Sequence, residues 1–179
     1  LLTPDHFEFS RTSARILHLG LPGLHEQMDA PWQEDPNGWV TVLKKAQAAG
    51  IRTNIEMCSL PPDRLSGMVE PCLGHLDYLV INDFEVAALA GRPVRHGEET
   101  DVAACLENAG DVFASGSMEL LVVHFPLGSI AMSRTATPLI MPSVAIPKEA
   151  VVGPNGAGDA FASGVLYGLH QGWELKATM

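Results

Sequence analysis

A glycine-rich segment near the end of the chain carries the residues best suited to chemistry. It reads Gly153-Pro154-Asn155-Gly156-Ala157-Gly158-Asp159-Ala160-Phe161 and runs directly into an apolar helical pattern. The first backbone N–H groups of a helix have no partner inside the helix, and the helix dipole adds partial positive charge there. A helix that starts in this way binds anions, and phosphate is the usual one. We therefore predict a phosphate site on the backbone of this segment.

Asp159 distinguishes this segment from the phosphate-binding loop of nucleotide hydrolases. The spacing of Gly153 and Gly158 imitates that loop, but Asp159-Ala160 stands where it requires Lys followed by Ser or Thr. A carboxylate repels a resident phosphate, so its useful role is to accept the proton of an incoming hydroxyl. An anion site beside a base predicts phosphoryl transfer to an alcohol. The residues alone also allow a simple helix start, with Asp159 complementing the dipole.

A second segment, Asn82-Asp83-Phe84-Glu85, follows a buried apolar run. As a structural feature, it predicts an N-cap Asn with Glu three residues later, a variant of the capping box. As a functional feature, it places Asn82 and Glu85 at the phosphates of a nucleotide, with Glu85 holding Mg²⁺ through water. Mg²⁺ keeps several waters and takes few protein carboxylates, so one such residue is sufficient. Both interpretations stay open at this point.

Strand and helix patterns alternate along the chain and must position these two segments. We expect strands at 15–20, 51–57, 76–81 and 120–125, with short antiparallel strands within 129–146. We expect helices that end before Gly50, Gly91, Gly110 and Gly172, and a weak helix that starts at Pro61-Pro62-Asp63. Strands that are apolar on both faces predict a mostly parallel sheet covered by helices, and ligands bind beyond the carboxyl ends of such strands.

Composition limits the class of protein and its partners. A chain of 179 residues with 46% apolar residues suits a single α/β domain over residues 1–179. The net charge of −10 disfavours nucleic acid and anionic membranes as partners, and no apolar run approaches the length of a membrane span. Cys58, Cys72 and Cys105 have no metal-ligand spacing, so we expect reduced thiols in a cytoplasmic protein. Because the sequence starts without Met and stops within a helical pattern, we expect a piece of a longer protein.

Taken together, the two segments resemble the ribokinase-like, or PfkB, carbohydrate kinases. Gly156 to Phe161, followed by Ser163-Gly164, is similar to the C-terminal signature of that family. Residues 77–91 are similar to its strand followed by Asn-x-x-Glu, and 121–132 to its nucleotide-side strand and turn. The resemblance covers nearly all the chain. It implies a ribokinase-like three-layer α/β/α fold with a mostly parallel sheet, lacking the N-terminal sugar-binding and lid part of the family.

The resemblance also implies an activity and assigns roles to residues. The activity is transfer of the γ-phosphoryl group of ATP, with Mg²⁺, to a hydroxyl of a small sugar or sugar-like substrate. Asp159 becomes the general base, and the amides of Gly156, Ala157 and Gly158 become the anion hole. The remaining roles are nucleotide binding by Asn82, Gly128 and Asn155 and Mg²⁺ coordination, through water, by Glu85.

Departures from the family pattern keep two alternatives open. Gly153-Pro154 replaces an Asp-Thr pair whose aspartate often belongs to a monovalent-cation site, so potassium activation is not implied. The nucleotide turn keeps only Gly128, and His124 is either a replacement for a lost polar contact or a structural residue. The alternatives are a non-catalytic nucleotide-binding descendant of the fold and a nucleoside kinase of the same family. Family members often dimerise through the lid, which leaves a homodimer of the complete protein open.

Overall fold

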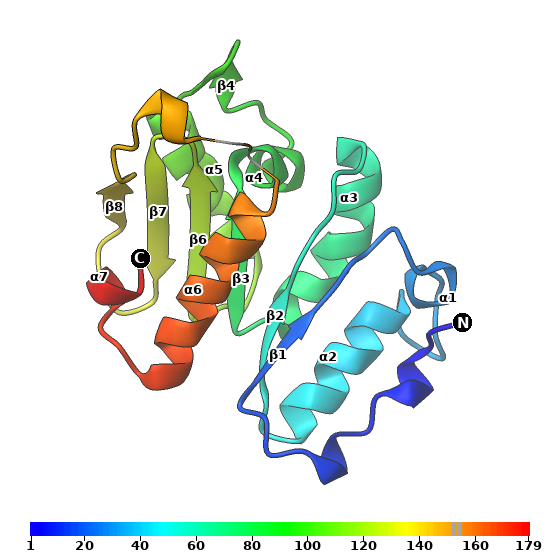
Figure 1. Cartoon of the computed structure of the whole chain (residues 1–179). Helices are drawn as coiled ribbons and strands as arrows, with labels where there is room; N and C mark the ends of the chain where they lie inside the picture. Colours follow the sequence, from blue (N-terminus) through cyan, green and yellow to red (C-terminus); the bar gives the residue numbers. More distant parts are fainter. Residues whose placement is uncertain (152, 154) are drawn as a thin grey trace.

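A mostly parallel sheet forms the centre of the molecule (Figure 1). The computed structural model describes residues 1–151, 153 and 155–179. In these residues, six strands have the spatial order β1-β2-β3-β6-β7-β8. The first four pair in parallel, and β7 pairs antiparallel with both β6 and β8. Their bounds are β1 (Ile16–Leu19), β2 (Arg52–Ile55), β3 (Tyr78–Asn82), β6 (Leu120–Phe125), β7 (Gly128–Ser133) and β8 (Leu139–Pro142). The predicted parallel sheet and the antiparallel pair that follows it are confirmed.

Helices cover both faces of this sheet. One buried cluster joins alternate strand residues, such as Leu79 and Leu121, to α2, α3, α4 and α5, whereas a second joins Val80 and Val122 to Val165 of α6. Because neighbouring residues of a strand point to opposite faces, these two clusters lie on the two sides of the sheet. The longer helices are α2 (Gly38–Ala48), α3 (Pro62–Val69), α4 (Asp83–Ala90), α5 (Val102–Ser115) and α6 (Ala157–Gln171). Figure 1 shows α6 crossing the sheet at β3 and β6.

Short elements complete the chain. They are η1 (Pro4–His6), η2 (Phe9–Arg11), α1 (Glu26–Asp29), η3 (Glu70–His75), β4 (Arg95–His96), β5 (Glu99–Thr100), η4 (Lys148–Ala150) and α7 (Leu175–Thr178). Within the described ranges, no helix has both the length and the apolar character needed to cross a membrane. The three cysteines are free thiols, with Cys72 and Cys105 buried and Cys58 partly exposed.

The expected end of α5 at Gly110 is wrong, because this helix continues to Ser115. A Cβ added at Gly110 would approach only the tip of Met132, at 4.0 Å, so the helix passes through this residue without strain. The helix stops at Gly116 instead, where a Cβ would come within 2.8 Å of the carbonyl oxygen of Leu73. The contact with Leu73 therefore accounts for glycine at this helix end. The expected stops at Gly91 and Gly172 are confirmed, and both residues have positive φ angles.

The β4–β5 hairpin, which the sequence patterns did not predict, is fastened to the first turn of α4. Asp83 is buried there, and its carboxylate accepts a hydrogen bond of 2.6 Å from the Thr100 hydroxyl. The same carboxylate pairs with Arg95 at 3.4 Å, and the Arg95 guanidinium lies 4.5 Å from the ring centre of Phe84. These contacts hold the β4–β5 hairpin against the start of α4.

Candidate active site

The start of α4 is a reciprocal cap formed by Asn82 and Glu85. The Asn82 side-chain oxygen accepts hydrogen bonds from the backbone N–H groups of Phe84 and Glu85, at 2.9 and 3.0 Å. In return, the Glu85 carboxylate accepts one from the Asn82 backbone N–H at 2.8 Å. The structural interpretation of this segment, a capping box, is thus confirmed. In the described part of the chain, the Asn82 Nδ2 group donates to no residue, which leaves this group available for a ligand.

Glu85 is held in surroundings that disfavour its charge. Burial raises the pKa of Glu85 to about 7, and the nearby charge of Glu56 acts in the same direction. The hydrogen bond from the Asn82 backbone opposes this increase. A carboxyl group with a pKa so close to neutrality gains by meeting a cation, because the cation restores its charged form.

Glu56 and His18 join this edge of the sheet from β2 and β1. The His18 imidazole contacts the Glu56 carboxylate through Nε2, and its Nδ1 lies 2.8 Å from the side chain of the buried Asn54. No motif singled out either residue, and their only sequence signal is a place near the end of a strand. Only the order of the strands brings Glu56, which follows β2, toward Glu85 of α4, which follows the neighbouring strand β3.

The first turn of α6 contains the residues predicted for an anion site. Gly156 is the N-cap residue, with a φ of 78°, and the helix begins with the bond from Ala160 N–H to its carbonyl, at 2.9 Å. The amides of Ala157, Gly158 and Asp159 precede that bond and donate to no other described residue, as expected for a helix start. The Asp159 side chain is exposed. Asn155 is exposed in the turn before the helix, and Pro154 lies outside the described residues.

His124 lies between the two predicted segments. It stands beside Asn82 in the parallel register of β3 and β6. On the α6 side, a Cβ added at Gly158 would lie 3.4 Å from Cε1 and 3.7 Å from Nε2 of the imidazole. Its ring centre is 4.9 Å from that of Phe161. The fold therefore brings Asn82 and the glycine-rich helix start, which are distant in sequence, to one edge of the sheet.

Gly128 has a structural reason to be glycine. It pairs with Phe125 across the β6–β7 turn and with Pro142 of β8. A Cβ at this position would lie 2.4 Å from the carbonyl oxygen of Met141, closer than packed atoms can come. This close approach accounts for the glycine without a ligand, and nucleotide binding by Gly128 stays a prediction.

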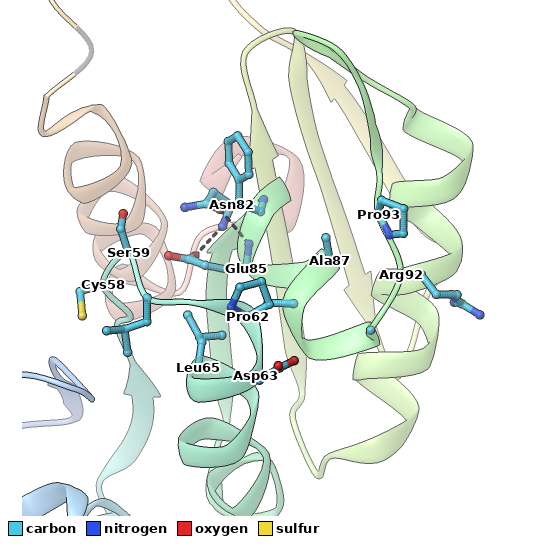
Figure 2. Close-up of a pocket in the computed structure, with 14 residues that line it drawn as sticks. Cys58, Ser59, Pro62, Asp63, Leu65, Asn82, Glu85, Ala87, Arg92 and Pro93 are labelled. Atoms are coloured by element: carbon cyan, nitrogen blue, oxygen red, sulfur yellow. Dashed lines mark hydrogen bonds between the residues drawn. The ribbon is translucent and has the colours of Figure 1, made fainter.

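A cavity lies between the start of α3 and α4 (Figure 2). Its volume is about 670 Å³, and Cys58, Leu65, Asn82, Glu85 and Arg92 are among its lining residues. Of the predicted site residues, it contains Asn82 and Glu85 but none from α6. The described residues contain no group of three or more His, Cys, Asp or Glu side chains able to hold a metal ion.

Solved structures with the same fold are small-molecule kinases. Phosphofructokinase-2 from Escherichia coli, in complex with substrates and products, has a TM-score of 0.62 at 20% identity, over 91% of this chain and 47% of that one. A Burkholderia thailandensis nucleoside kinase in complex with inosine has a TM-score of 0.57 at 17% identity, over 95% of this chain and 48% of that one. Arabidopsis thaliana ribokinase, in complex with ribose and ATP, has a TM-score of 0.60 at 20% identity, over 78% of this chain and 41% of that one. Such low identities establish the fold alone, and the chain spans about half the length of these proteins or less.

The fold is that of the ribokinase-like α/β kinases, with a mostly parallel sheet between helices. Residues 27–179 match the model of the family described as pfkB family carbohydrate kinase. The chain belongs to this family. A search of curated proteins finds no match.

Proposed function

We propose that the complete protein is an ATP-dependent, Mg²⁺-requiring kinase that phosphorylates a hydroxyl group of a sugar or sugar-like substrate. The observation that carries this proposal is the first turn of α6. Its amides at Ala157 and Gly158 have no partner among the described residues, and the exposed Asp159 carboxylate follows them directly. This turn lies beside His124 at the edge of the sheet where Asn82 caps α4.

The reaction follows from the residues at this edge. The Asp159 carboxylate accepts the proton of the acceptor hydroxyl as its oxygen forms a bond to the γ-phosphorus of ATP. The bond from that phosphorus to the bridging oxygen breaks, and ADP leaves. The amides of Gly156, Ala157 and Gly158 donate to the oxygens of the transferring group. Fixed donors of this kind stabilise the charge that develops, which is the main contribution of a protein to phosphoryl transfer.

Asn82 and Glu85 act on the nucleotide side of the proposed site. The free Nδ2 group of Asn82 donates to a phosphate oxygen, while its Oδ1 keeps the cap of α4. Glu85 is suited to hold Mg²⁺ through water, because its carboxyl group is partly buried and its pKa is raised to about 7. When bound, Mg²⁺ supplies positive charge that offsets the charge of the phosphates. Asn155 and Gly128 would complete the nucleotide contacts.

The test is ADP release by the complete natural protein, given ATP, Mg²⁺ and a panel of sugars and nucleosides. Turnover with one acceptor would support the proposal and name the substrate. The Asp159→Asn variant should lose about 100- to 10,000-fold in kcat, because proton abstraction is removed. It should bind ATP nearly as well as the wild type. Near-normal turnover by this variant would show that Asp159 is not the base. ATP binding without turnover on any acceptor would instead favour the non-catalytic alternative.

A further inference from the structure

One contact between the sheet and α6 has consequences for the proposed reaction. His124 is the fifth residue of β6, and its side chain points to the face covered by α6, as the neighbouring Val122 does two residues earlier. On that face, the imidazole meets Gly158 and Phe161 of α6. These two residues are three apart in the helix, so they lie on the same side of it.

Between Gly158 and the imidazole there is room for a methyl group and little more. A Cβ added at Gly158 would lie 3.4 Å from Cε1 of His124 and 3.7 Å from Nε2, which is ordinary van der Waals contact. The ring therefore lies beside the first turn of α6. Three residues further, the Phe161 ring is tilted by 42° against the imidazole, with the centres 4.9 Å apart.

Packing rather than hydrogen bonding defines the place of His124. Among the residues that the structure describes, none forms a hydrogen bond with its ring. Burial lowers the pKa of His124, and the charge of Asp83 opposes this decrease only in part. A neutral ring suits this place, because the positive end of the α6 dipole repels an imidazolium ion.

We propose that His124 is a positioning residue, which acts as a spacer between β6 and the first turn of α6 and so sets the distance of the Gly158 amide and the Asp159 carboxylate from the sheet. The inference rests on the proposed function, since these two groups are its anion hole and base. A shift of about 1 Å in a catalytic group costs about 100-fold in rate. Without the spacer, the helix start can move toward the sheet, away from its working position.

Two variants of His124 separate its shape from its nitrogen atoms. His124→Phe keeps a flat ring between Gly158 and Phe161, whereas His124→Ala removes it. In the complete protein, we expect His124→Phe to keep kcat within about 2-fold of the wild type. We expect His124→Ala to lose about 10- to 100-fold in kcat, with KM for ATP changed less than about 3-fold. His96→Ala is the control, because that side chain is 85% exposed on the β4–β5 hairpin.

A readout without turnover keeps this inference separate from the proposed function. In amide NMR spectra of the 179-residue chain, His124→Ala should shift the signals of Gly158 and Asp159, and His124→Phe should leave them nearly unchanged. If the wild type phosphorylates no acceptor, the proposed function fails. The NMR spectra alone then test whether His124 sets the position of the first turn of α6. Unchanged signals in His124→Ala, or equal damage by His124→Phe and His124→Ala, would overturn the inference. Equal damage would mean that a ring nitrogen, and not the shape of the ring, is required.

Discussion

Asn82 and Glu85 cap each other at the start of α4, with hydrogen bonds of 3.0 Å from the Glu85 N–H to the Asn82 side chain and 2.8 Å from the Asn82 N–H to the Glu85 carboxylate. The two residues proposed for the nucleotide and its metal are therefore also the residues that fix the helix start. A loss of activity in a variant of either one can come from the cap or from the ligand. A substitution that keeps the helix cap but removes the ligand contact separates the two roles.

Asn82→Ser makes this separation at Asn82. Serine caps helices about as well as asparagine, so we expect the free energy of unfolding to change by less than about 0.5 kcal/mol. The variant lacks the Nδ2 donor, so ATP affinity should fall about tenfold. Urea unfolding and calorimetric titration with ATP measure the two quantities. The control Asn82→Ala should lose ATP affinity and also about 1 kcal/mol in the free energy of unfolding. Unchanged ATP affinity in Asn82→Ser would leave Asn82 a cap only.

Glu85→Gln should reveal the raised pKa of Glu85 as a stability that depends on pH. The pKa of Glu85 rises from 4.5 to about 7 on folding, so the folded state binds the proton more tightly. Ionisation of Glu85 therefore does not destabilise the folded wild type below pH 4.5. The free energy of unfolding falls as the pH rises from 4.5 to about 7. Glutamine is neutral throughout and can still accept the Asn82 N–H. Without Mg²⁺, the variant should be more stable than the wild type by about 3 kcal/mol at pH 8 and equal to it at pH 4. An equal difference at both pH values would contradict the raised pKa.

Gly128→Ala and Gly110→Ala should have opposite effects on stability. A Cβ at Gly128 would lie 2.4 Å from the Met141 carbonyl oxygen, so β7 and β8 must separate, at a cost of about 2 kcal/mol or more. Gly110 is inside α5, and its Cβ would approach only Met132 at 4.0 Å. Alanine there should stabilise the protein by about 0.5 to 1 kcal/mol. Thermal and urea unfolding of both variants test the contact in the sheet and the continuous helix together.

Asp83→Ala should destabilise the protein far more than Asp111→Ala. The Asp83 side chain is 4% exposed and holds Arg95 and Thr100, whereas Asp111 is 64% exposed in its pair with Arg92. Removing the buried partner leaves Arg95 without its counter-charge, for a cost of about 3 kcal/mol. Removing the surface partner should cost less than about 1 kcal/mol. Similar losses in urea unfolding would mean that the β4–β5 hairpin is not held by Asp83.

Thiol labelling should distinguish Cys58 from the other two cysteines. Burial raises the pKa of Cys72 and of Cys105 to about 12, so neither forms a thiolate at pH 8 in the folded protein. Cys58 is partly exposed and lines the cavity beside α3. With Ellman's reagent, we expect slow reaction of Cys58 in the folded protein and of all three after unfolding. Cys58→Ser should abolish the reaction of the folded state, and a remaining signal would show that a buried thiol is accessible.

The sequence by itself determined the local elements and the class of fold. β6 is apolar on both faces over Leu120–Phe125, and this pattern predicts a strand inside a covered sheet. Asn82 followed by Glu85 predicts a helix start, and Gly91 and Gly172 predict two helix ends. These features are readable because caps, turns and periodic burial depend on residues within one element or beside it.

Only the tertiary structure decided which elements meet and how closely. It ended α5 at Gly116 rather than Gly110, it left no room for a side chain between Gly116 and the carbonyl of Leu73, and it made Gly128 obligatory through Met141. It also brought Glu56 toward Glu85 and placed His124 against Gly158. Such contacts join elements far apart in the chain, and their distances depend on strand order and packing. The spacing of residues in a sequence does not record either one.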